Sequence, residues 1–132
     1  MAVTLDWAGF EQVLVDAVVH NVRATVAVCP DERFYAAVLD HIYREADGQI
    51  TLPNFGINSI EALAQHPVEK QSRLRWSGPD FDRYYIDWLD EDQTRQWERA
   101  LTAEACRGST RQWESTFRRY LTMLVRVCKR PG

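Results

Sequence analysis

Few side chains in this sequence are spaced for catalysis. His20, His41 and His66 lie far apart, and no two of them are four residues apart, as two metal ligands on one helix face would be. Asp40 and His41 form the only adjacent pair of an acid and an imidazole. Neighbouring residues of a strand point to opposite faces, so in a strand this pair cannot serve one reaction centre. We therefore expect no catalytic histidine.

The segment LRWSGPDFDRYYIDW, residues 74–88, gathers aromatic rings and carboxylates around a Gly-Pro break. Trp, Tyr and Arg are enriched among binding hot spots, and carboxylates speed encounter with basic partners. An acid–base couple would need a neighbour that separates the two pKa values, and the sequence shows none. Asp80 and Asp82 do not match a calcium loop, because the Gly and the terminal Glu of that motif are missing.

The sequence therefore predicts a protein-binding surface in this segment, with Trp76 in the core. The predicted contacts are Asp80, Asp82, Tyr84, Tyr85, Asp87 and Trp88. The alternative is that these rings belong to the core and its rim.

Motifs for cofactors are absent. Neither G-x-G-x-x-G, nor a Walker-type loop, nor a G-x-S-x-G elbow occurs. Cys29, Cys106 and Cys128 are far apart and odd in number, which argues against a disulfide framework and against zinc. We expect no cofactor, no metal site and no catalytic residue.

The formal charge of −3 conceals an asymmetry. Residues 1–92 hold 16 acidic and 7 basic side chains, whereas residues 93–132 hold 3 and 9. A basic last helix is a possible nucleic-acid-binding face, but the acidic remainder would repel phosphates. The other interpretations are a solvated helix face, or contact between the two halves. We expect no nucleic-acid partner.

Apolar spacing predicts a long first helix. Over residues 5–28 apolar residues recur every three or four positions, Asp6 can accept from the first-turn amides, and Pro30 ends the pattern.

Two more helices are predicted at the end of the chain. Asp90 or Asp92 can cap the first of them, and Gly108 supplies its stop. Ser109 and Gln112 form a capping-box pattern that opens the last helix, which carries a strong apolar stripe.

Strands are expected in the middle of the chain. Residues 34–43 are apolar on much of both strand faces, and Ala-Asp-Gly at 46–48 is a hairpin-type turn. Residues 49–55 would form the returning strand, and Pro53 places it at an edge or ends it.

The next segment is predicted as a short helix and a third strand. Asn58 would start a helix over residues 60–65, which Pro67 limits. Residues 73–77 alternate polar and apolar, which favours a strand, and residues 78–80 break it.

These elements predict a single α+β domain over residues 1–132. It has a long N-terminal helix, a small, mainly antiparallel sheet of three or four strands, a short middle helix, and two C-terminal helices packed on the sheet.

Three runs resemble an uncharacterised family of small bacterial α/β proteins: FYAAVLD at 34–40, INSIEAL at 57–63, and LRWSGPDF at 74–81. Family members carry a Phe-Tyr-Ala strand, a helix after Asn-Thr or Asn-Ser, and an Arg-Trp-Ser-Pro segment, into which this chain inserts Gly78. Their genes often lie near polymorphic or contact-dependent toxins. The resemblance implies an immunity protein, and its motifs name no catalytic residue.

We therefore expect a protein that neutralises a cognate toxin by direct binding. The N-terminus lacks a secretory pattern and no apolar run approaches the roughly 18 residues of a membrane span, so the expected location is the cytoplasm. One alternative is a small hydrolase or transferase using Asp40, His41 and a carboxylate of residues 80–92. Another is a homo-oligomeric structural domain that sets the basic last helix of one copy against the acidic segment of another.

Overall fold

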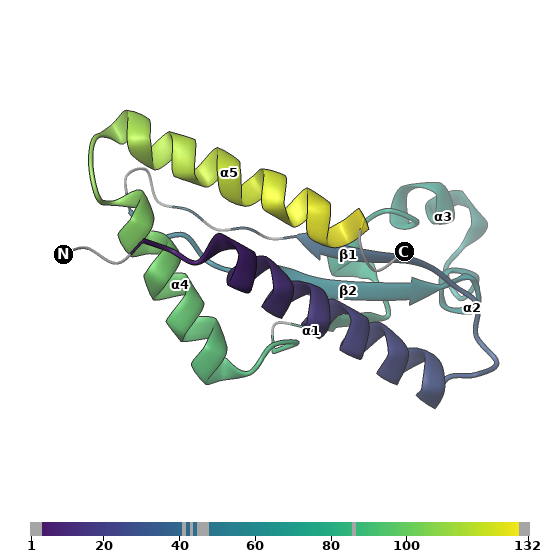
Figure 1. Cartoon of the computed structure of the whole chain (residues 1–132). Helices are drawn as coiled ribbons and strands as arrows, with labels where there is room; N and C mark the ends of the chain where they lie inside the picture. Colours follow the sequence, from purple (N-terminus) through teal and green to yellow (C-terminus); the bar gives the residue numbers. More distant parts are fainter. Residues whose placement is uncertain (1–3, 41, 43, 45–47, 86, 130–132) are drawn as a thin grey trace.

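The computed structural model describes residues 4–40, 42, 44, 48–85 and 87–129, and it confirms the predicted α+β class (Figure 1). The elements in chain order are α1 (Trp7–Val28), β1 (Phe34–Asp40), β2 (Asn54–Ser59), α2 (Ile60–Leu63), α3 (Val68–Leu74), the 3-10 turn η1 (Gly78–Asp80), β3 (Arg83–Tyr85), α4 (Glu91–Ala105) and α5 (Thr110–Lys129).

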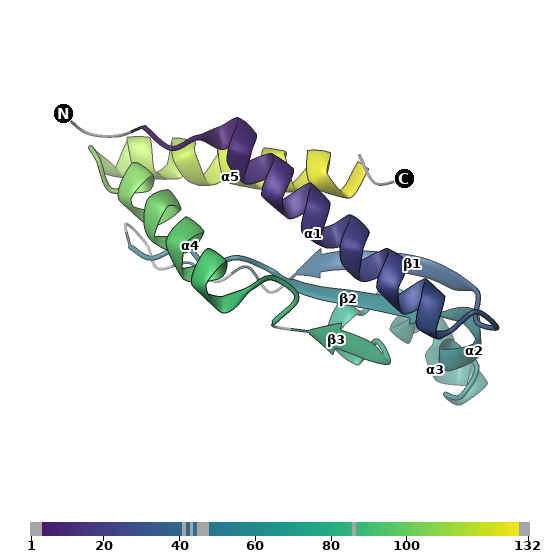
Figure 2. The same cartoon turned by 60° about the horizontal axis from the view of Figure 1, so that its bottom comes forward.

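The sheet has three antiparallel strands in the order β1-β2-β3. The two faces of the sheet differ in what covers them. Phe55 and Ile57 of β2 point into the main core, whereas Gly56 points to the other face, toward Phe81 and Tyr84. Figure 2 shows the long helices α1 and α5 on one side of the sheet and α3 on the other.

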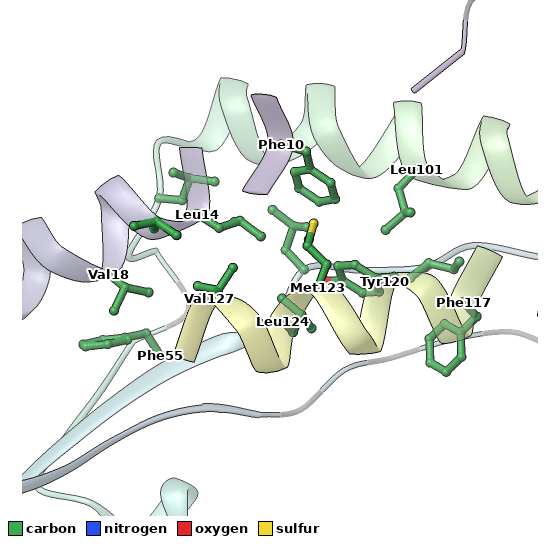
Figure 3. Packing of buried hydrophobic residues seen from close by; sticks show 14 of the residues in the cluster. Phe10, Leu14, Val18, Phe55, Leu101, Phe117, Tyr120, Met123, Leu124 and Val127 are labelled. Atoms are coloured by element: carbon green, nitrogen blue, oxygen red, sulfur yellow. The ribbon is translucent and has the colours of Figure 1, made fainter. Parts of the chain in front are cut away.

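The core lies among α1, α4 and α5 and extends to Phe55 of β2 (Figure 3). The ring of Phe10 stacks on Trp97 at 4.9 Å and lies 5.9 Å from the ring of Tyr120, which joins α1, α4 and α5. Leu14 and Met123 fill the space around these rings. Burying one such side chain contributes about 1.5–3 kcal/mol relative to leaving it exposed.

Helix ends follow the predicted caps. Asp6 accepts from the amide of Gly9 at the start of α1, and Asp90 accepts from the amide of Gln93 at the start of α4. Before α5, Ser109 and Gln112 each accept a hydrogen bond from the backbone amide of the other. This reciprocal pair is the predicted capping box.

The prediction of a returning strand over residues 49–55 is wrong. Residues 48–53 form an arm in which Ile50 makes a single bridge to Arg44, and β2 begins only after Pro53. β2 is also the central strand and does not lie at an edge. The strand predicted to reach Tyr43 ends at Asp40. Residues 41, 43, 46 and 47, which include part of the predicted turn, lie outside the described residues.

Side chains of α4 and α5 explain why the arm is not a strand. The amide of Ile50 donates to Thr102 Oγ1 at 3.1 Å, and the amide of Leu52 donates to Glu98 Oε2 at 2.7 Å. The carbonyls of Gly48 and Thr51 accept from Trp113 Nε1 at 2.9 Å and Tyr120 Oη at 3.1 Å. The backbone of the arm is therefore hydrogen-bonded to helix side chains, and these take the place of a neighbouring strand.

The prediction of a strand over residues 73–77 is also wrong. α2 ends at Leu63, and Pro67 is the N-cap residue of α3, which continues to Leu74. Leu74 is buried, but Trp76, which was predicted in the core, is 65% exposed. One buried Leu between two exposed arginines fits a helix as well as a strand, so the short alternation is ambiguous.

α2 begins at Ile60, as predicted, but it ends at Leu63 and not near residue 65, and its cap lies one residue later than predicted. Ser59 is the N-cap, and its Oγ accepts from the amide of Ala62 at 3.0 Å. The predicted cap, Asn58, is a buried residue of β2 whose amide group bonds to Tyr35 and to the backbone of Asp82.

Candidate docking surface

All six carboxylates of residues 80–92 are exposed, and Arg83 is the one basic residue in that range. Asp80 accepts from Ser77 Oγ at 2.6 Å, and Asp82 lies 3.2 Å from a guanidinium nitrogen of Arg83. The Asp82 side chain nevertheless keeps 58% of its surface exposed. The segment thus presents a negative field to solvent, as a docking surface for a basic partner requires.

The structure divides the six predicted contact residues among several places. Tyr84 and Tyr85 are neighbours on β3 and point to opposite faces of the sheet. Tyr84, half-buried beside η1, donates to Asp40 and accepts from Asn54 Nδ2 at 3.1 Å. Burial, and the hydrogen bond to Asp40, raise the pKa of Tyr84 above its usual range.

Tyr85 and Asp87 line a groove of about 290 Å³ between the C-terminal half of α1 and β3. Asn21 of α1 fixes one side of this groove, because its Nδ2 donates to the carbonyl of Trp88 at 2.9 Å. Val28 adds an exposed apolar side chain to the wall.

Trp88 belongs to the core and cannot be the predicted partner contact. Its side chain is 7% exposed, its Nε1 donates to the carbonyl of Pro53 at 2.8 Å, and its ring lies 5.9 Å from that of Phe55. A buried Trp normally finds such a hydrogen-bond acceptor. The sequence pattern predicted Trp76 in the core and Trp88 at the surface, whereas Trp76 is exposed and Trp88 is buried.

Sequence reasoning missed the exposed aromatic group beside the acidic residues. Trp76 lies next to Tyr35 of β1 and beneath the guanidinium of Arg75. The signal that could have found it is the Ser-Gly-Pro break directly after Trp76, since a residue at a turn is more often exposed than one inside a strand.

A second polar cluster links α1 to β3. Glu32 accepts from Ser59 Oγ at 2.6 Å and from Arg83 Nη2 at 3.0 Å, and the same Nη2 lies 2.9 Å from Cys29 Sγ. The hydrogen bonds from Ser59 and Arg83 lower the pKa of Glu32. Burial, followed by the hydrogen bond with Glu32, raises the pKa of the Cys29 thiol. The raised pKa favours the protonated thiol, which is the weaker nucleophile.

The carboxylate of Asp40 lies against the 3-10 turn η1. A Cβ on residue 78 would stand 2.2 Å from Asp40 Oδ2, so a side chain there would displace the Asp40 carboxylate, and glycine lets η1 pass close to it. His41, the proposed partner of Asp40 in the enzyme alternative, lies outside the described residues.

Two arginine side chains of the basic last helix, α5, contact side chains near the start of the chain. Arg126 Nε lies 3.0 Å from Glu11 Oε1 of α1, and the guanidinium of Arg119 lies 4.5 Å from the ring centre of Trp7. The ion pair between Arg126 and Glu11 therefore joins one basic side chain of α5 to an acidic side chain of α1.

Within the described ranges, no group of three or more His, Cys, Asp and Glu side chains is placed to hold a metal ion. None of the helices in the same part of the chain has the length and apolar character needed to cross a membrane. Comparison with protein-family models, with curated proteins and with solved structures gave no significant match.

Proposed function

We propose that the protein is an immunity protein: a non-catalytic, cytoplasmic inhibitor that neutralises a cognate bacterial toxin by direct binding. The observation that carries the proposal is the exposure of all six carboxylates of residues 80–92 around a single arginine. Asp90 caps α4, and Glu91 pairs with Arg95. Asp82, which precedes β3 in the chain, and Asp87, which follows it, are exposed.

The chemistry of the partner follows from this field. A surface rich in carboxylates accelerates encounter with a basic protein and repels acidic ones. A nuclease toxin with a basic substrate cleft fits this requirement, because carboxylates can occupy the positions of nucleic-acid phosphates. An inhibitory complex of standard size buries about 1,600 Å² in total.

The test is charge reversal with a matched control. The double variant Asp82→Lys and Asp87→Lys is compared with Asp16→Lys and Glu69→Lys, which changes net charge equally at exposed positions outside residues 80–92. The binding partner is the purified product of the adjacent reading frame, and association is followed by surface plasmon resonance at several salt concentrations.

We expect the 82/87 variant to associate at least tenfold more slowly, with a weaker salt dependence, because electrostatic steering acts mainly on the association rate. The 16/69 variant should bind nearly as the wild type does, and both variants should keep a melting temperature within a few degrees of wild type. Unchanged association of the 82/87 variant, or no complex with the neighbouring gene product, would refute the proposal.

A further inference from the structure

We infer that Trp76 is the anchor of the toxin complex, inserting into an apolar pocket of the toxin that has a basic rim; this inference rests on the proposed function. The indole follows the end of α3 and is 65% exposed. A large exposed ring contributes little to folding, whereas truncation of a buried interface Trp is among the costliest changes in binding.

The indole is held in place before any partner arrives. Its ring and the ring of Tyr35 form a T-shaped pair with a centroid distance of 5.9 Å and an interplanar angle of 80°. The guanidinium of Arg75 lies 5.3 Å from the centre of the indole and 4.9 Å from the centre of the Tyr35 ring. Trp, Tyr and Arg, the three residue types most enriched at hot spots, thus form one cluster in mutual contact.

Tyr35 is itself fixed by the fold. Its hydroxyl donates to the carbonyl of Arg75 at 2.8 Å and accepts from Asn58 Nδ2 at 3.1 Å. The ring of Phe81 also contacts the Tyr35 ring, in a T-shaped arrangement with 6.2 Å between the ring centroids. Because this support is already ordered in the free protein, little conformational entropy is lost when the indole is buried in a complex.

The same network positions the nearest carboxylates. Asn58 Oδ1 accepts from the amide of Asp82 at 3.3 Å, and Asp80 is held by Ser77, the residue next to Trp76. One connected unit, which we name the Trp76 surface, therefore combines the anchor ring with its charged rim. It consists of Tyr35, Arg75, Trp76, Asp80 and Asp82.

The composition of the Trp76 surface specifies the partner. An apolar pocket would accept the indole, basic side chains would face Asp80 and Asp82, and an acidic or carbonyl group would face Arg75. Stacking of a nucleic-acid base on Trp76 is disfavoured, because the backbone phosphates would come close to the two carboxylates. The surface of a protein toxin can supply all three kinds of group.

The experiment measures the affinity and dissociation rate of the toxin, produced from the adjacent reading frame, for Trp76→Ala and Trp76→Phe. Val125→Ala is the matched control, since Val125 is an apolar side chain on α5 that is 53% exposed. We expect Trp76→Ala to raise Kd about 30-fold, the equivalent of a 2 kcal/mol hot spot, through faster dissociation. Trp76→Phe should retain most of the affinity, and Val125→Ala all of it.

The outcomes separate this inference from the proposed function. If Trp76→Ala binds as the wild type while the 82/87 charge reversal still slows association, the anchor is refuted and the immunity function stands. If neither change affects binding, or no complex forms, both are refuted. Binding of single-stranded oligothymidylate by the wild type, lost in Trp76→Ala, would overturn the assignment of a protein partner.

Discussion

Replacing Trp88 by Ala should destabilise the protein far more than the same change at Trp76. Trp88 is 7% exposed, packs on Phe55 and donates to the carbonyl of Pro53. A Trp of this kind buries about 150–250 Å², which corresponds to about 4–6 kcal/mol at about 25 cal/mol per Å². Measured Trp-to-Ala costs in cores are about 3–5 kcal/mol, so we expect a loss of about 4 kcal/mol.

Trp76 provides the contrast. With 65% of its surface in water, it has little transfer free energy to lose, and its contacts with Tyr35 and Arg75 are at the surface. Trp76→Ala should therefore change the free energy of unfolding by about 1 kcal/mol or less. Trp88→Phe should fall between the two, because it keeps a ring but leaves the buried Pro53 carbonyl without its donor, at about 1–3 kcal/mol.

The assay is urea unfolding followed by circular dichroism at 222 nm. For a chain of this size, with a slope of about 1.5 kcal/mol per M, a loss of 4 kcal/mol lowers the midpoint by about 2.7 M. A loss of less than about 1 kcal/mol for Trp88→Ala would contradict the burial of Trp88. A larger loss for Trp76→Ala than for Trp88→Ala would contradict the exposure of Trp76.

Two further predictions concern helix caps and alkaline pH. Asp90→Ala and Ser109→Ala should each lower the free energy of unfolding by about 1 kcal/mol in the same urea assay, because each removes a side-chain acceptor from a helix start; a loss near zero would contradict the caps. Burial raises the pKa of Tyr120 above its ordinary value of about 10, so above pH 10 the unfolded chain releases a proton that the folded chain retains. Stability should therefore fall there by about 1.4 kcal/mol per pH unit for this group, and urea midpoints of Tyr120→Phe should decline less steeply than those of wild type; equal slopes would contradict the assignment.

The helices α1, α4 and α5 could be predicted because their signals are local. Each has an apolar stripe at helical spacing and a cap within three residues of its start. Their ends are also set by neighbours in the chain, such as Pro30 after α1. Such patterns carry their meaning without knowledge of the rest of the fold.

The position of β2 could not be predicted because its reasons are non-local. Gly56 is a weak strand former, yet here a Cβ at position 56 would stand only 3.1 Å from the ring of Tyr84 and 3.3 Å from Val38 Cγ2, so the missing side chain leaves room for both. Asn58 and Ser59 are polar but buried, and their partners Tyr35 and Glu32 come from distant parts of the chain.

The acidic part of the candidate site was predictable, but its aromatic part was not. Carboxylates are costly to bury, so composition alone places Asp80, Asp82 and Asp87 at the surface. Trp76 and Trp88 have the same chemistry, and their different burial depends on distant partners, such as the carbonyl of Pro53 for Trp88 and the ring of Tyr35 for Trp76. Those two partners lie 35 and 41 positions away in the chain, beyond the reach of any local pattern.

The arm of residues 48–53 ties the middle of the chain to its end. Four of its backbone groups are bonded to side chains that follow 46 to 69 positions later. During synthesis the arm therefore leaves the ribosome long before its hydrogen-bond partners, Glu98, Thr102, Trp113 and Tyr120, have been added to the chain. The nascent polypeptide stays incomplete until α5 emerges, and a chain released before residue 120 would expose peptide groups that the finished protein keeps from water.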